Sequence, residues 1–241
     1  MPRPGTIDLL ADLSEEQWGL FTRRQAEATG MAWTTLSRLA ASGAAERVAH
    51  GVYRLRGAPS ADHLALRAAW LQLEPDTPAW ERGPDSGVVS HRSAAALYGL
   101  GHLPADVHEF TLPRRRQSRR TDVRFRRGRL GDGEWISLRG LPVTRPSRIA
   151  ADLLAAQEDP DAVAQIVADA LRAVYDYPGT VAGAIAPRAA RFGLRRGDGL
   201  ALLTWLLDLT GDPERGTWLD EARASLAREA RDDRHRVDPV P

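Results

Sequence analysis

Residues 22–56 change from helical to strand-like hydrophobic spacing within 35 residues, and this pattern strongly restricts the fold of the chain. Residues 23–28 and 33–42 both have helical spacing, and Gly30 between them permits the positive φ of a tight turn. Thr22 is the predicted N-cap of the first helix, because its hydroxyl can accept a backbone N–H that the first turn leaves free. Two helices joined by a short glycine turn are typical of the helix-turn-helix, whose second helix enters the major groove of DNA.

Beyond Gly43 the hydrophobic period shortens from 3.6 toward 2, which predicts a small β-hairpin. Its strands are residues 45–48 and 52–55, and residues 49–51 connect them. A hairpin with arginines on its strands and a histidine at its tip suits contact with phosphate groups or the minor groove. The segment therefore predicts a winged helix-turn-helix with these DNA contacts: Thr22, Arg23, Trp33, Thr34, Thr35, Ser37, Arg38, Arg47, His50 and Arg54.

The outward positions of the second helix differ in what they can recognise. Arg38 is the predicted base reader, because its planar fork can bond guanine O6 and N7 together; the alternative is a merely solvated side chain. Thr34 and Thr35 can donate to phosphate or touch a thymine methyl group. For Trp33 two interpretations stay open, a ring packed in the domain core or a ring in contact with DNA.

Composition excludes several kinds of chemistry. The 241 residues contain no cysteine and no lysine, so all 33 basic side chains are arginine. Without cysteine there are no disulfides, no thiolate catalysis and no cysteine-ligated metal centres. Without lysine there is no Walker A loop, no Schiff-base chemistry and no serine–lysine hydrolase. Apolar runs stay far below the ~20 residues that span a bilayer, and residues 1–13 lack the features of a secretory signal. We therefore expect a cytoplasmic protein with no membrane partner.

Positive charge is concentrated in one segment, although the formal net charge is only +1. Residues 113–130 contain nine arginines and one acid. Such an excess repels itself unless a partner neutralises it, so we predict a second surface for nucleic acid or for a protein partner. A solvated hairpin is the alternative. The candidate residues are Arg114, Arg115, Arg116, Arg119, Arg120, Arg124, Arg126 and Arg127, and Arg129 ends the run.

The chain as a whole is predicted to have an α+β fold: an N-terminal winged helix-turn-helix domain, then a mixed α+β C-terminal domain ending in a helical bundle. The predicted boundaries are 1–57 for the DNA-binding domain, 58–87 for a connector helix and loop, 88–212 for the C-terminal domain, and 213–241 for a last helix and flexible tail. Further helices are predicted at 61–73, 90–98, 146–155, 161–174, 180–192, 200–209 and 218–230, and strands at 107–112, 121–125, 134–138 and 141–144. Residues 14–17 resemble a capping box that would start a first helix burying Trp18 and Phe21, and Ser60 and Ser90 are predicted N-caps.

Two phrases of the sequence resemble a known family. They are VSHRSAAALYGL at residues 89–100, followed by VHEFTLP at residues 107–113, and GLPVTRPSRIAADLL at residues 140–154. With the N-terminal pattern, they make roughly residues 10–175 similar to the AbiEi family of type IV antitoxins. The resemblance implies a transcriptional autorepressor without catalytic residues, whose winged helix binds an inverted-repeat operator in double-stranded DNA. It also implies that the C-terminal domain serves antitoxicity against a nucleotidyltransferase-like toxin encoded by the adjacent gene. We expect no cofactor, and a monomer or weak dimer that pairs on DNA.

Two other classes of protein stay open. A winged-helix-linked, metal-dependent nuclease would use acids near the predicted strands, namely Glu109, Asp122, Asp132 and Glu134, but their spacing does not force them together. His91, His102 and His108 lack the close spacing of a metal site, so no metal is predicted. A ligand-responsive repressor unrelated to a toxin would need an apolar pocket among the C-terminal helices.

Overall fold

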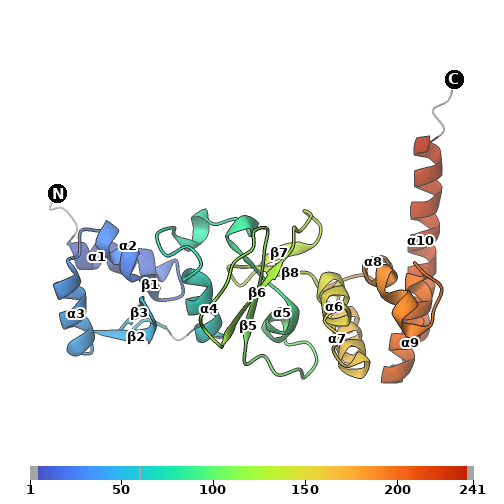
Figure 1. The fold of residues 1–241 in the computed structure, drawn as a ribbon, viewed down its shortest axis with the longest axis horizontal. Helices are drawn as coiled ribbons and strands as arrows, with labels where there is room; N and C mark the ends of the chain where they lie inside the picture. The colour runs from blue at the N-terminus through green and yellow to red at the C-terminus, as the bar shows by residue number, and fades with distance from the viewer. Residues whose placement is uncertain (1–4, 60, 238–241) are drawn as a thin grey trace. The chain divides into compact units, whose positions relative to one another are not determined.

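The computed structural model describes residues 5–59 and 61–237 (Figure 1). These residues divide into two compact units. Unit 1 comprises the described residues up to Val88 together with Phe110–Arg129 and Ser137–Pro142. Unit 2 comprises Val89–Glu109, Leu130–Ile136 and the described residues from Val143 onward. The whole predicted DNA-binding segment and the arginine-rich run therefore belong to unit 1. Helices and strands both contribute, so the fold is mixed α+β as expected.

The N-terminal part of unit 1 fits a winged helix-turn-helix. Its elements are α1 (Thr6–Glu15), β1 (Leu20–Thr22), α2 (Arg23–Ala28), α3 (Trp33–Ala41), β2 (Ala45–Ala49) and β3 (Val52–Leu55). The three strands form an antiparallel sheet in the order β1-β3-β2. The two predicted helices and the predicted hairpin are confirmed. Strand β1 is an addition, because three residues are too few to reveal a period.

Thr22 caps α2 as the sequence predicts. The backbone N–H of Gln25 donates to the Thr22 hydroxyl at 3.1 Å, and the backbone N–H of Thr22 donates to the Gln25 side chain at 2.9 Å. This reciprocal pair is a capping box. The turn after α2 and the end of α3 have the expected glycines, with φ of 89° at Gly30 and 73° at Gly43.

A small apolar core holds these elements together. Its buried members are Leu10, Phe21, Ala26, Met31, Leu36, Ala45 and Tyr53. The rings of Phe21 and Tyr53 stack across β1 and β3 with centroids 5.8 Å apart. Leu36 is the inward side chain of α3, whereas Leu39 is only partly buried against the same core. The opposite face of α3 is consequently left exposed.

The predicted start of the first helix is wrong. Residues 14–17 lie at the end of α1, which begins at Thr6, where the Asp8 side chain accepts the N–H of Gly5 at 2.9 Å. The chain then turns through Trp18 and Gly19, which have φ of 61° and 76°. A tryptophan and a glycine in the left-handed region cannot continue a helix. Phe21 is buried as predicted, but in β1 rather than in a helix.

Gln17 and Gln25 form a buried amide pair that the sequence does not reveal. Each side-chain amide donates to the oxygen of the other at 3.0 Å. The Gln17 oxygen also accepts the backbone N–H of Ala79 at 2.8 Å, and the Gln25 amide donates to the Thr77 carbonyl at 3.2 Å. The pair thus joins the start of α2 to residues 77–79 of the same unit.

Arg67 ties a second part of unit 1 together. It lies in α4 (Leu64–Leu71), its side chain is 2% exposed, and its Nη2 donates to Asp62 at 2.8 Å. Its guanidinium group also covers the Trp18 ring at 4.5 Å and donates to the Arg139 carbonyl at 2.9 Å. Helix α4 is shorter than the predicted 61–73, and the predicted N-cap Ser60 lies outside the described residues.

A five-stranded sheet has the order β6-β5-β4-β8-β7. Its strands are β4 (Val88–Val89), β5 (His108–Leu112), β6 (Val123–Arg127), β7 (Trp135–Leu138) and β8 (Leu141–Thr144). The predicted strands at 107–112, 121–125, 134–138 and 141–144 are confirmed within two residues at each end. Two-residue β4 is an addition, and it pairs in parallel with β8 through Val89 and Val143.

The helices of unit 2 are mostly those expected. They are α5 (His91–Tyr98), α6 (Pro146–Ala155), α7 (Pro160–Arg172), α8 (Pro178–Ile185), α9 (Gly199–Thr210) and α10 (Arg215–Val237). The predicted helix 180–192 is divided, because Pro187 lacks an N–H and the chain continues as a 3-10 helix from Ala186 to Phe192. Helix α10 runs past the predicted end at residue 230, and residues 238–241 of the predicted tail lie outside the described part.

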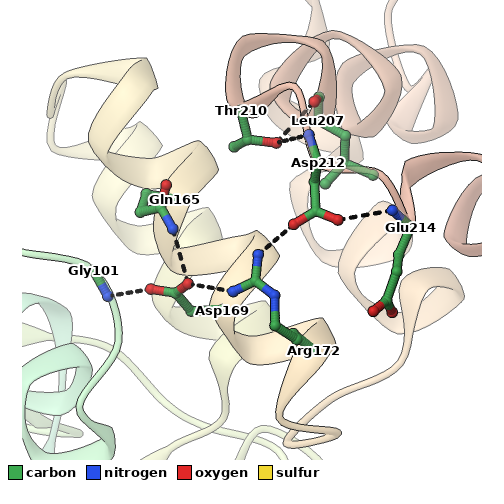
Figure 2. A network of polar contacts seen from close by, with 8 residues as sticks. All are labelled: Gly101, Gln165, Asp169, Arg172, Leu207, Thr210, Asp212 and Glu214. Atoms are coloured by element: carbon green, nitrogen blue, oxygen red, sulfur yellow. Dashed lines mark hydrogen bonds and ion pairs between the residues drawn. The ribbon is translucent and has the colours of Figure 1, made fainter.

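Two further details of unit 2 differ from or add to the prediction. Ser90 occupies the N-cap position of α5, but its hydroxyl makes no capping hydrogen bond and lies 3.0 Å from His91 Nδ1. Figure 2 shows Arg172 of α7 between two carboxylates, Asp169 on its own helix and Asp212 beyond α9. Asp169 also accepts the N–H of Gly101 at 2.9 Å. This network joins three segments of unit 2.

Candidate nucleic-acid interface

The outward face of α3 is free of the core and rich in hydrogen-bonding groups. Trp33, Thr34, Ser37 and Arg38 are exposed, and Thr35 is partly buried. Trp33 is 44% exposed, so it is not a core residue and the interpretation as a packed ring is excluded. Arg38 Nη2 donates to the Thr35 hydroxyl at 3.3 Å, which leaves most of its N–H donors available.

Arg23 and Trp33 connect the beginnings of α2 and α3. The Arg23 guanidinium carbon lies 4.3 Å from the centre of the Trp33 ring, and Arg23 Nε donates to Glu27 at 2.7 Å. Thr22 is buried, and its hydroxyl also donates to the Pro75 carbonyl. Thr22 therefore fixes the start of α2, and the next residue, Arg23, is exposed and available to a partner.

The wing places its basic side chains on different faces. Arg47 and His50 are exposed at the tip, where Arg47 Nη2 lies 3.0 Å from His50 Nδ1. Arg54 pairs across the strands with Glu46 at 2.7 Å, and its side chain is 22% exposed. Neighbouring residues of a strand point to opposite faces, so Arg54 and Glu46 do not share a face with Arg47. Arg47 and His50 are the basic side chains of the wing that have no carboxylate partner among the described residues.

Gln72 joins the wing tip to the arginine-rich run, a relationship that sequence reasoning missed. Gln72 Nε2 donates to the His50 carbonyl at 2.6 Å, and its oxygen accepts from Arg120 Nη1. Arg120 is itself held by Asp122, and this hydrogen bond raises the pKa of Arg120. A lone glutamine at the end of a helix gives no recognisable signal in a sequence.

The arginine-rich run has two kinds of member. Arg116 donates to the Leu73 carbonyl at 2.8 Å and lies over the Phe125 ring, and Arg124 and Arg126 also have partners. The members whose side chains have no hydrogen bond or ion pair to another described residue are Arg114, Arg115, Arg119, Arg127 and Arg129. These five side chains can bind a partner without breaking an internal hydrogen bond or ion pair.

Three of the four acids considered for a nuclease, Glu109, Asp122 and Glu134, have structural contacts of their own. Glu109 is buried and accepts the N–H of Arg92 at 3.2 Å. Burial alone would raise the pKa of Glu134, but hydrogen bonds from Gly131 and Arg148 lower it overall. Within residues 5–59 and 61–237, no three His, Asp or Glu side chains come together in a way that would hold a metal ion.

The family comparison agrees with this geometry. Residues 8–56 match the family model described as a transcriptional regulator, AbiEi antitoxin. The match spans α1 to the end of the wing and confirms the AbiEi resemblance there, which supports a DNA-binding regulator role. No curated protein matches the chain. None of the described helices is long and apolar enough to cross a membrane.

Proposed function

We propose that this protein is a sequence-specific DNA-binding autorepressor and the antitoxin of a type IV toxin–antitoxin pair. The observation that supports it best is the exposed face of α3, which lies within the residues that match the antitoxin regulator family. A helix held from behind by Leu36, with Trp33 and Arg38 outward, has the form needed to enter the major groove.

Three kinds of contact contribute to DNA binding. Arg38 reads a guanine edge through its free N–H donors, and Thr34 contacts phosphate or a thymine methyl group beside it. Arg47 and His50 at the wing tip meet the sugar–phosphate backbone or the minor groove. The five unpaired arginines of the arginine-rich run add phosphate contacts, which raise affinity without reading the sequence.

Repression follows from occupancy of the promoter. Two copies bind the halves of an inverted repeat, because a two-fold operator matches a two-fold pair of proteins. RNA polymerase is then excluded from the promoter of the operon. The second part of the proposal, that a nucleotidyltransferase-like toxin of the adjacent gene is neutralised, is supported by the antitoxin description of the matched family.

Two experiments test these parts separately. Selection of duplexes from a random library should yield an inverted repeat, and the same repeat should occur upstream of the gene. Expression of the adjacent gene should arrest growth, and co-expression of this protein should restore it. Selection of no consensus would contradict the regulator, whereas a consensus without growth rescue would contradict only the antitoxin.

A further inference from the structure

A cleft of about 680 Å³ lies beside the wing tip in unit 1. Thr22, Gly51 and Val52 are among its lining residues, and Gln72 and Pro75 line it from the end of α4. The charged residues of its lining are Arg23, Arg24, Glu27 and Arg120, and His50 also contributes to it. Three guanidinium groups and one carboxylate line the cleft, and Asp76 and Asp122 lie beside Arg24 and Arg120.

The guanidinium groups have donors to spare. An arginine has five N–H groups. Arg120 uses Nε and Nη2 on Asp122 and Nη1 on Gln72, which leaves the second N–H of each terminal nitrogen. Arg23 uses Nε on Glu27, and Arg24 has only a long pair with Asp76 at 3.8 Å. The Arg23–Glu27 and Arg24–Asp76 pairs are solvent-exposed, so they contribute little and do not prevent binding of an anion.

The cleft is held in shape by contacts that do not involve an anion. The Arg23 backbone N–H donates to the Gly51 carbonyl at 2.8 Å, which joins the start of α2 to the wing. Gln72 holds the His50 carbonyl on one side and Arg120 on the other. The wing-tip backbone and the Arg120 side chain are therefore positioned before a ligand arrives, which lowers the entropic cost of binding.

We propose that this cleft is a phosphate-binding site in which Arg24 and Arg120 contact the anion directly and Gln72 is a positioning residue. Arginine suits this role because its planar fork bonds phosphate oxygens in pairs. The phosphate is that of a DNA backbone beside the wing or that of a free phosphate compound. If the phosphate belongs to DNA, this inference rests on the proposed function, because it adds one more phosphate contact next to the wing.

The test compares Arg24→Gln and Arg120→Gln with the control Arg196→Gln, an exposed arginine of unit 2. Each variant is titrated with the selected duplex and, separately, with sodium pyrophosphate in the absence of DNA. Arg24→Gln keeps the test valid if Arg120→Gln unfolds, because the Arg24 side chain makes no hydrogen bond within the described residues. Urea unfolding of each variant shows whether the fold is intact.

If the bound phosphate belongs to DNA, either variant should weaken duplex binding about threefold to tenfold. It should also lower the slope of log K against log salt by about one. Phosphate ethylation interference should also disappear at one position per half-site. If the bound phosphate is a free compound, duplex binding should be unchanged in both variants. The wild type should then bind pyrophosphate, and the variants should not. If both titrations match the control, the cleft is not a phosphate site. If the wild type binds no duplex, the proposed function fails, and the pyrophosphate titration still decides the cleft.

Discussion

The guanidinium group of Arg23 lies over the indole of Trp33 at 4.3 Å, so the first residue of α2 contacts the first residue of α3. Both groups are exposed, and their contact does not support the core. Trp33→Ala should therefore change the free energy of unfolding by less than ~0.5 kcal/mol. It should weaken duplex binding by about 1 kcal/mol, or roughly fivefold in Kd, because Arg23 loses its support. Urea titration and fluorescence anisotropy check the two values. A large loss of stability with unchanged Kd would show that Trp33 has a structural role and does not contribute to DNA binding.

Arg38 should discriminate between bases. Arg38→Ala is expected to weaken binding to the selected duplex by about 1–3 kcal/mol, because alanine cannot make the bidentate hydrogen bonds to guanine. Binding to a scrambled duplex should fall much less, since a side chain that reads bases contributes little where its guanine is missing. Parallel mobility-shift titrations give the ratio of the two affinities. Equal losses on both duplexes would exclude base reading by Arg38.

The unpaired arginines should control the salt dependence of binding. Replacing Arg114, Arg115 and Arg119 by Gln should lower the slope of log K against log salt by about 0.9 for each phosphate that the variant no longer neutralises. Arg116→Gln serves as a comparison, because Arg116 is held by Leu73 and Phe125 and should change stability more than slope. Titrations at several salt concentrations provide the slopes. An unaltered slope in the triple variant would assign this run to another partner.

Asp62 should make unit 1 less stable in acid. Hydrogen bonding to Arg67 lowers the pKa of Asp62, with a further contribution from Arg139. A carboxyl whose folded pKa is lowered stabilises the fold above its unfolded pKa, near 4, and this contribution is lost as pH falls through the lower folded value.

The matching variant is Asp62→Asn. At pH 7 it should cost about 1 kcal/mol, the low end for a charged hydrogen bond because Asp62 is half exposed. The cost should shrink below pH 4, where the wild type loses the same charge. Urea unfolding at pH 7 and pH 3 checks this, and a cost independent of pH would show that the ionised carboxylate is not responsible.

The buried amide pair should be costly to break. Gln17→Ala is expected to destabilise by about 2–4 kcal/mol, because it leaves the Ala79 N–H and both polar ends of Gln25 without the partners that Gln17 provides. Gln117→Ala, at an exposed position, should change stability by less than ~0.5 kcal/mol. Chemical unfolding of both variants makes the comparison. Similar values for the two would mean that water replaces the Gln17 contacts.

Local features of the fold could be predicted from the sequence, and contacts between distant residues could not. Thr22, Gly30 and Gly43 determine a cap and two turns through their own chemistry, so α2, α3 and the hairpin were predictable. Strand β4 depends on its pairing with Val143, and no local pattern in two residues indicates it. The start of α1 was misassigned because Ser14–Gln17 has the composition of a capping box, while the left-handed turn at Trp18 follows from tertiary contacts.

The candidate site divides in the same way. The outward residues of α3 follow from helical spacing, and the structure leaves them exposed. The pairing of Arg54 with Glu46 follows from strand register, which the sequence leaves open. The cleft at Gln72 requires residues 50, 72 and 120 to meet, and only the folded chain brings them together.

The decisive measurement is a hydroxyl-radical footprint of the purified protein on the DNA upstream of its own gene, with and without Mg²⁺. Binding by α3 and the wing predicts two protected half-sites whose centres are about one helical turn, or a multiple of it, apart. Arg38→Ala should remove this protection at concentrations where the wild type is saturated, and intact DNA should be recovered in Mg²⁺. Absence of protection at any concentration, or Mg²⁺-dependent cleavage of the DNA, would contradict a DNA-binding repressor.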